Sequence, residues 1–327
     1  LMNLLSKSKF IENYNFGIPQ IIQKELIADI ETPISSLLKI TRNEKYSFLL
    51  ESVEGGDQRG RFSLLGCDPD LIWEVKDNKV TIKPLDQNLN LSFLSQKPIK
   101  SIKELINFSK IERDKNDPPF PVLVGYLGYP MIRFMENIEL KNPDEINIPD
   151  AVMIRPKIVA VFDNIKDTIN IMTSIYPSKK IKADFAIDQA YYLIDKAIKK
   201  LNKDIPTNSL NDDQANDLIN FKSNYTKKEY FEIIEKAKTY IRKGDIFQVV
   251  TSQRFQSEYN LDASTLYRSL RRLNPSPFLV NLNFDKFGLV ASSPEILVRL
   301  RNNKITIRPI AGTRKRGKNL NEDLMLS

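Results

Sequence analysis

Short extended runs separated by tight-turn signals fill the first 165 residues, and this pattern most constrains the fold. Residues 70–75 and 79–83 flank Asp77 and Asn78, a pair that favours a two-residue hairpin turn. Gly125 interrupts an apolar run, which indicates a bulge or a close approach of two backbones. Strands are expected over 46–52, 61–66, 70–75, 79–83, 122–129 and 154–162. This part of the chain is therefore predicted to be rich in β-structure.

Helical periodicity begins near residue 180. A helix is expected over 180–201, because apolar residues there follow helical spacing: Phe185, Ile187, Ala190, Tyr191, Ile194 and Ile198. The polar, Asn- and Asp-rich stretch 202–217 that follows is predicted to be a linker. We accordingly divide the chain into an N-terminal domain (1–201), the linker and a second region (218–327).

The second region opens with a helix whose two ends are marked in the sequence. Thr226 and Glu229 form a capping box, and Gly244 stands where a C-terminal cap belongs. Residues 245–255 are then predicted to form a strand in which Gln248 is partly buried among apolar neighbours. A helix over 263–273 and a meander of strands are expected to follow, at 278–284, 288–292, 297–300 and 305–307.

The composition excludes several classes of function. With 41% hydrophobic and 28% charged residues, the 327-residue chain is typical of soluble globular proteins, and no apolar run is long enough for a membrane helix. The lack of histidine excludes Ser-His-Asp triads and histidine-bound zinc within this chain. Its one cysteine, Cys67, excludes an internal disulfide, suits a reducing cytoplasm and is expected to be a packing or loop residue.

The net charge of +8 is concentrated in one segment. Residues 299–320 carry many lysines and arginines and no acidic residue, so the rest of the chain is close to neutral. Binding to nucleic acid is therefore not expected. A local basic cluster instead suits an anionic substrate.

Five uncommon strings occur in order in the second region: 244–250, 252–255, 274–280, 292–295 and 309–314. Together they resemble the large subunit (component I) of anthranilate synthase, a chorismate-utilising enzyme. The resemblance implies an α/β fold of stacked antiparallel sheets with outer helices. It also implies a lyase that converts chorismate and ammonia to anthranilate and pyruvate in tryptophan biosynthesis.

Four positions of these strings bear on the substrate. By resemblance, Gln248 lies at the ammonia and substrate site, where isochorismate-forming relatives carry a lysine that activates water. The backbone of Gly312 and the hydroxyl of Thr313 are expected to contact chorismate. Ala311 stands where the aminodeoxychorismate synthase branch typically has lysine, which favours anthranilate as the product.

A second resemblance concerns feedback inhibition. Residues 49–52 and 61–63 are similar to the family's tryptophan-binding motif, in which Ser52 would combine with Pro277, Phe278 and Leu279 to enclose the inhibitor. An indole needs an apolar slot and an amino acid needs a few polar groups. The alternative is that these segments merely pack against each other in the core.

The resemblance implies further components that these residues do not supply. Mg²⁺ is the expected cofactor, with its ligands and the catalytic acid beyond Ser327, and Glu295 is expected to be structural. The chain is thus expected to be the front part of an enzyme and inactive alone. A glutamine amidotransferase subunit (component II) is the expected partner and source of ammonia.

Two other functions remain open at this stage. One is the large subunit of aminodeoxychorismate synthase, an enzyme of folate synthesis, against which Ala311 counts. The other, from a different class, is a non-catalytic fragment that binds tryptophan or a partner protein.

Overall fold

The structure is a computed structural model that describes residues 4–42, 44–54, 58–114, 117–205, 220–301, 303–309 and 315–326. The chain divides by its internal contacts into two compact units. Unit 1 comprises Leu1–Pro206 and Ala263–Ser327, and unit 2 comprises Thr207–Asp262. No described helix is both long and apolar enough to cross a bilayer.

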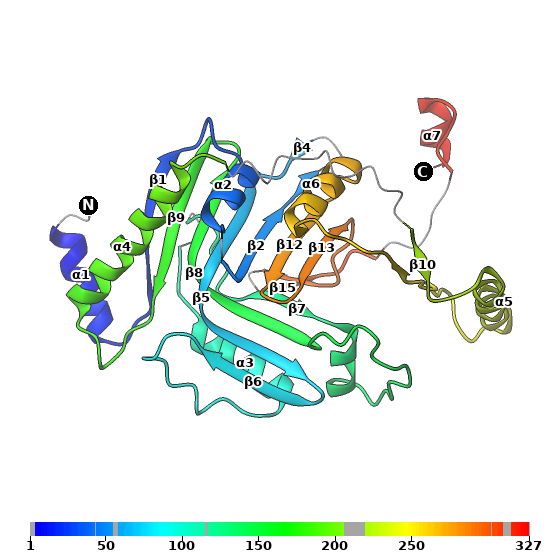
Figure 1. Cartoon of the computed structure of the whole chain (residues 1–327), viewed down its shortest axis with the longest axis horizontal. Helices are drawn as coiled ribbons and strands as arrows, with labels where there is room; N and C mark the ends of the chain where they lie inside the picture. Colours follow the sequence, from blue (N-terminus) through cyan, green and yellow to red (C-terminus); the bar gives the residue numbers. More distant parts are fainter. Residues whose placement is uncertain are drawn as a thin grey trace. The chain divides into compact units, whose positions relative to one another are not determined.

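Unit 1 is built on a nine-stranded antiparallel sheet (Figure 1). Seven strands follow the order β1-β9-β8-β5-β2-β12-β13. Outside this order, β6 pairs with β5 and β7 pairs with β8. Their bounds are β1 Gln20–Ile27, β2 Tyr46–Glu51, β5 Phe62–Lys76, β6 Lys79–Pro84, β7 Val124–Leu127, β8 Ala151–Asp163, β9 Thr168–Ile175, β12 Phe278–Phe284 and β13 Gly288–Ser293. The expected mixed α/β class, with antiparallel sheet and helices, is confirmed, whereas the expected stacking of antiparallel sheets stays a prediction.

Short paired strands and helices complete unit 1. The small strands are β3 Val53–Glu54 with β4 Gln58–Arg59, and β14 Arg299–Arg301 with β15 Lys304–Thr306. The helices are α1 Leu4–Asn15, α2 Pro33–Ile40, α3 Pro98–Ser109, a 3₁₀ turn Tyr129–Phe134, α4 Ala183–Leu201, α6 Ala263–Leu273 and α7 Leu320–Leu326. Helix α4 lies against β9, α6 against β12 and β13, and α3 against β6 (Figure 1).

The turn and glycine predictions for the first region are confirmed. Asp77 and Asn78 both have positive φ angles, 49° and 65°, as a type I′ hairpin between β5 and β6 requires. A Cβ atom on Gly125 would lie 1.9 Å from the carbonyl oxygen of Val152. Strand β7 can therefore pair with β8 only because residue 125 has no side chain.

Helix α4 supplies much of the main core. Its buried residues follow helical spacing and include Ile187, Ala190 and Ile194 of the predicted stripe; the full set is Ala183, Ala186, Ile187, Ala190, Ile194, Ala197 and Leu201. They pack with residues of β1, β5, β8 and β9. Phe185, expected on this stripe, is instead 55% exposed, because it falls on the opposite side of the helix from Ile187.

Unit 2 contains α5 Lys227–Lys243 and a small ladder of β10 Lys222–Ser223 with β11 Phe255–Gln256. The capping box is present, since the Thr226 hydroxyl accepts from the Glu229 amide and the Glu229 carboxylate accepts from the Thr226 amide. Gly244 ends the helix in the left-handed conformation at φ 77°. Both expected helix signals are thus confirmed.

The expected strand over 245–255 is wrong. Only Phe255 and Gln256 are strand residues, and the backbone before them is irregular. A strand needs a hydrogen-bonded neighbour along its length, and among the described residues only β10 pairs with this segment. Phe247 is fully exposed and Val250 is 81% exposed, so the apolar neighbours of Gln248 on either side of it are themselves unburied.

The proposed domain boundaries stay a prediction. Most of the expected linker, 206–217, lies outside the described residues. Strands β12 and β13, which the sequence analysis placed in the second region, join the sheet formed by the first. Unit 1 therefore draws on both regions of the sequence.

Candidate functional site

Strand pairing in unit 1 brings the two predicted halves of the tryptophan site together. Strand β2 pairs with β12 in antiparallel register, with Glu51 opposite Leu279. Just beyond the paired segment, the Val53 amide donates to the Ser276 carbonyl at 3.1 Å. Ser52 lies between these two contacts and is therefore opposite Phe278. We call this place, residues 51–53 with 276–279, the β2–β12 junction.

The strand geometry separates the predicted contact residues onto two faces. Leu279 is buried and packs in the same core cluster as Leu49 and Tyr267, beneath α6. Ser52 and Phe278 share the opposite face, because side chains alternate along paired strands. Ser52 is half-buried and Phe278 is 39% exposed. A ligand on the Ser52–Phe278 face would not meet the Leu279 side chain in this structure.

Glycine and hydroxyl contacts fix the backbone of the junction. The Gly60 amide donates to the Ser52 carbonyl at 2.7 Å, and a Cβ atom at Gly60 would lie 2.7 Å from the Ser52 Cβ. On the other strand, the Ser292 hydroxyl donates to the Asn274 carbonyl at 2.6 Å and lies 2.8 Å from the Ser276 hydroxyl. These contacts hold the segment before Phe278 against β13.

A buried network that the sequence analysis missed lies directly behind Ser52. Glu51 is 7% exposed and accepts a 2.7 Å hydrogen bond from the Tyr267 hydroxyl. Arg271 contacts the same carboxylate through Nε at 2.8 Å and through a terminal nitrogen at 3.0 Å. Burial and the adjacent Glu51 carboxylate raise the pKa of Tyr267 above its usual range, so its hydroxyl remains a donor. The network ties α6 to β2.

The sequence contains a signal that Glu51 is a buried carboxylate with partners. It is a charged residue at the end of the otherwise apolar run 48–50, where a buried carboxylate requires partners. Those partners, Tyr267 and Arg271, are more than 200 positions away. Only the pairing of β2 with β12 and the packing of α6 identify them.

Gln248 belongs to unit 2 and is exposed, so the expectation of a partly buried Gln248 is wrong. The cause is the missing strand: among the described residues no strand pairs with 248–254, so no neighbouring strand covers the amide. Its role at the ammonia and substrate site stays a prediction. Gly312 and Thr313, together with Ala311, lie outside the described residues, and their contacts with chorismate also stay predictions.

Glu295 is exposed, and the structural role expected for it stays a prediction. Its backbone amide donates to the Ser293 hydroxyl at 3.3 Å. Across the described part of the chain, no three or more His, Cys, Asp and Glu residues gather closely enough to hold a metal ion. The described residues therefore offer no Mg²⁺ site of their own, and Mg²⁺ as the cofactor stays a prediction.

Cys67 is a packing residue, as expected. Its side chain is 2% exposed within the main core, and burial raises the pKa of the thiol from 9.0 to about 12. A thiol that stays protonated at neutral pH is a poor nucleophile.

The sequence profile described as chorismate binding enzyme matches residues 86–327, most of the chain. The chain belongs to the chorismate-binding enzyme family. It is 40% identical over 326 residues to anthranilate synthase component 1 of Cereibacter sphaeroides, and 38% identical over 328 residues to the protein of that name from Aquifex aeolicus. Each alignment covers 99% of this chain and 65% of the relative, so the chain spans just under two thirds of their length.

Solved structures show the same fold. Anthranilate synthase component I from Streptococcus pneumoniae superposes with a TM-score of 0.60 at 24% identity, covering 86% of this chain and 60% of that one. The menaquinone-specific isochorismate synthase of Escherichia coli gives a TM-score of 0.52 at 11% identity, covering 98% of this chain and 62% of the other. At such identities the likeness concerns the fold alone.

Proposed function

We propose that this protein acts as the large subunit of anthranilate synthase, a lyase that forms anthranilate and pyruvate from chorismate and ammonia. The observation that carries the proposal is the 40% identity to a component 1 protein along nearly the whole chain. Ala311 supports anthranilate over aminodeoxychorismate as the product, since a methyl group offers no nucleophile to the ring. Mg²⁺ as cofactor and a glutamine amidotransferase as the partner that supplies ammonia are part of the proposal.

Regulation by tryptophan is the second part of the proposal. The β2–β12 junction supports it, because Ser52 offers a hydroxyl and Phe278 an apolar ring on one face of the same pair of strands. A side chain at position 60 would collide with the Ser52 side chain, so Gly60 leaves this hydroxyl in place on that face. An amino acid with an aromatic side chain matches this combination of polar and apolar groups.

A complementation experiment tests the activity. The gene that encodes this chain, supplied in full, is expected to restore growth without tryptophan to a bacterial strain that lacks anthranilate synthase component 1. It is expected not to restore growth without 4-aminobenzoate to a strain that lacks the aminodeoxychorismate synthase large subunit. The opposite pattern would assign the protein to the folate branch, and growth of neither strain would contradict both activities.

A further inference from the structure

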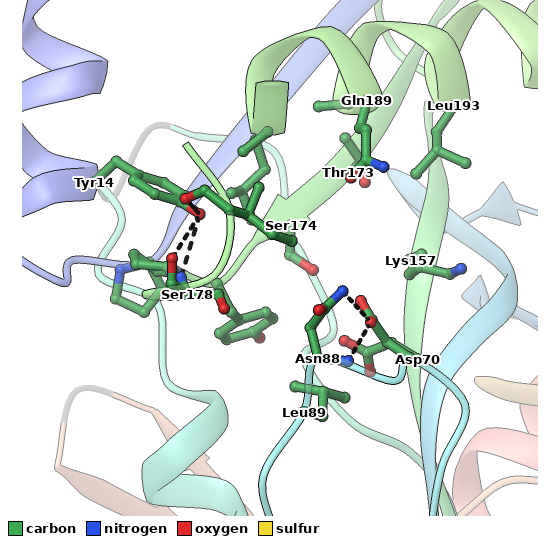
Figure 2. A pocket seen from close by; sticks show the side chains of 18 of the residues that line it. Tyr14, Asp70, Asn88, Leu89, Lys157, Thr173, Ser174, Ser178, Gln189 and Leu193 are labelled. Atoms are coloured by element: carbon green, nitrogen blue, oxygen red, sulfur yellow. Dashed lines mark hydrogen bonds between the residues drawn. The ribbon is translucent and has the colours of Figure 1, made fainter. Parts of the chain in front are cut away.

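Unit 1 contains a cavity of about 440 Å³ that the proposed function does not use. It lies between α4, the end of β9 and the loop after β6 (Figure 2). Gln189 and Leu193 of α4 are on one side of it, and Asn88 and Leu89 of the loop are on the opposite side. None of the described residues that line it belongs to the β2–β12 junction. Its volume is within the range of small-molecule sites, about 300–1,000 Å³.

One wall of the cavity is apolar. Ala186 and Ala190 of α4 face it with side chains too small to fill it, and the aromatic rings of Phe108 and Tyr176 border it. The Tyr176 hydroxyl donates to the Ser109 carbonyl at 2.9 Å, which fixes the ring. The wall is therefore shaped before any ligand arrives, which lowers the entropy cost of binding.

A buried ion pair supports this wall from behind. Arg155 is fully buried and donates to the two carboxylate oxygens of Asp70 at 2.8 and 2.7 Å. Its guanidinium lies 3.8 Å from the centroid of the Tyr176 ring. Arg155 neutralises Asp70, so this carboxylate, although it lines the cavity, leaves little charge for a ligand.

Two charged side chains that line the cavity can still bind a ligand. Asp86 accepts from the backbone and side-chain nitrogens of Asn88 at 2.9 and 3.0 Å through one oxygen, Oδ1. No ion pair joins Asp86 to a cation among the described residues. Lys157 is paired at 3.4 Å with Asp68, but its side chain is still 32% exposed. The cavity thus offers a carboxylate and an ammonium beside an apolar wall.

We propose that this cavity binds a free α-amino acid with an apolar side chain. The ligand's ammonium group pairs with Asp86, its carboxylate with Lys157, and its side chain lies against Tyr176, Leu193 and the two alanines of α4. A ligand with only one charge could form an ion pair with only one of these two groups. An apolar molecule without charges would gain nothing from Asp86 or Lys157. This inference is independent of the tryptophan site and of the proposed enzymatic activity.

Calorimetric titration of the purified protein with L-leucine and L-isoleucine tests the ligand class. We expect at least one to bind, and N-acetyl-L-leucine and L-leucinamide, each lacking one charge, to bind at least roughly tenfold more weakly than L-leucine or not at all. Tryptophan is not used as a probe, because it would also report on the β2–β12 junction. The proposal is overturned if neither amino acid binds at millimolar concentration, or if the blocked analogues bind equally well.

Variants of Asp86 and Lys157 test whether the amino acid binds in the cavity. Asp86→Asn keeps the acceptor for Asn88 but removes the negative charge. Lys157→Met removes the ammonium group and keeps a side chain of similar length. Each is expected to weaken binding roughly tenfold with an unchanged melting temperature. Asp188→Asn and Lys199→Met, both exposed on α4, are the matched controls and should bind as the wild type does, as should Ser52→Ala. Wild-type affinity in both cavity variants would refute the site.

Discussion

The Glu51 carboxylate depends on two side chains of α6 for its partners. Tyr267→Phe removes the 2.7 Å hydrogen bond and leaves the buried carboxylate with Arg271 alone. We expect this variant to lose about 1–3 kcal/mol of unfolding free energy, the cost of an unpaired buried polar group. Urea unfolding followed by the fluorescence of the single tryptophan, the fully buried Trp73, measures it. Tyr192→Phe, 67% exposed on α4, is the control, and equal stability of the two variants would contradict the role of the network.

Ser52 is the residue on which the proposed regulation can be tested most directly. Ser52→Ala should weaken tryptophan binding roughly tenfold or more, because a polar group of the amino acid would lose a partner at a cost of about 1–3 kcal/mol. Calorimetric titration with tryptophan measures the effect, and Ser257→Ala, exposed in unit 2, is the control. Unchanged affinity in a folded Ser52→Ala protein would place tryptophan elsewhere.

Cys67 makes stability depend on alkaline pH. Its pKa is about 12 in the folded protein and 9.0 without burial, so above pH 9 the unfolded chain loses the thiol proton first. Stability from this group is complete below 9.0 and falls as pH rises toward 12, by about 1.4 kcal/mol per pH unit. Between about pH 8 and 10.5, the wild type should therefore lose about 2 kcal/mol more than Cys67→Ala. Parallel losses in urea unfolding of the two proteins would refute this assignment.

Among the secondary-structure elements, the pairing of β7 with β8 depends on a single missing side chain. Gly125→Ala would place a methyl group 1.9 Å from the Val152 carbonyl oxygen, which cannot move without breaking the strand pairing. We expect a loss of about 3 kcal/mol or more. Gly17→Ala is the comparison: it has open space but φ +79°, and should cost about 1–2 kcal/mol. Thermal unfolding of both variants checks this order, and a smaller loss at Gly125 would contradict it.

Elements with local signals were predicted well, and elements that need distant partners were not. The caps of α5 depend on Thr226, Glu229 and Gly244, all within or next to the helix. The segment 245–255 has the composition of a strand, but a strand exists only when another strand pairs with it. Its apolar residues alone could not show whether such a neighbour is present.

At the scale of the whole molecule, the two units differ in how they are stabilised. Helix α4 of unit 1 has seven buried residues, whereas α5 of unit 2 has none, so α5 depends on its caps and backbone hydrogen bonds. Hydrogen–deuterium exchange should therefore reach completion in peptides from 227–243 while peptides from 183–201 still retain protons. Equal protection of the two helices would show that α5 is covered in solution.

The sequence by itself determined the local features and the family. The hairpin at Asp77 and Asn78, the caps of α5 and the order of the motif strings each depend on residues close together along the chain. Their conformational preferences act over a few positions, so they can be inferred without knowing the fold.

Only the tertiary structure decided which distant groups meet. It placed Ser52 beside Phe278, paired Glu51 with Tyr267 and Arg271, and buried Arg155 against Asp70. Apolar and polar patterns specify that a side chain is to be buried or exposed, but not which partner it will have, because pairing depends on strand register and on how helices pack. The candidate site was therefore predicted in part: its residues came from the motifs, and its arrangement came from the fold.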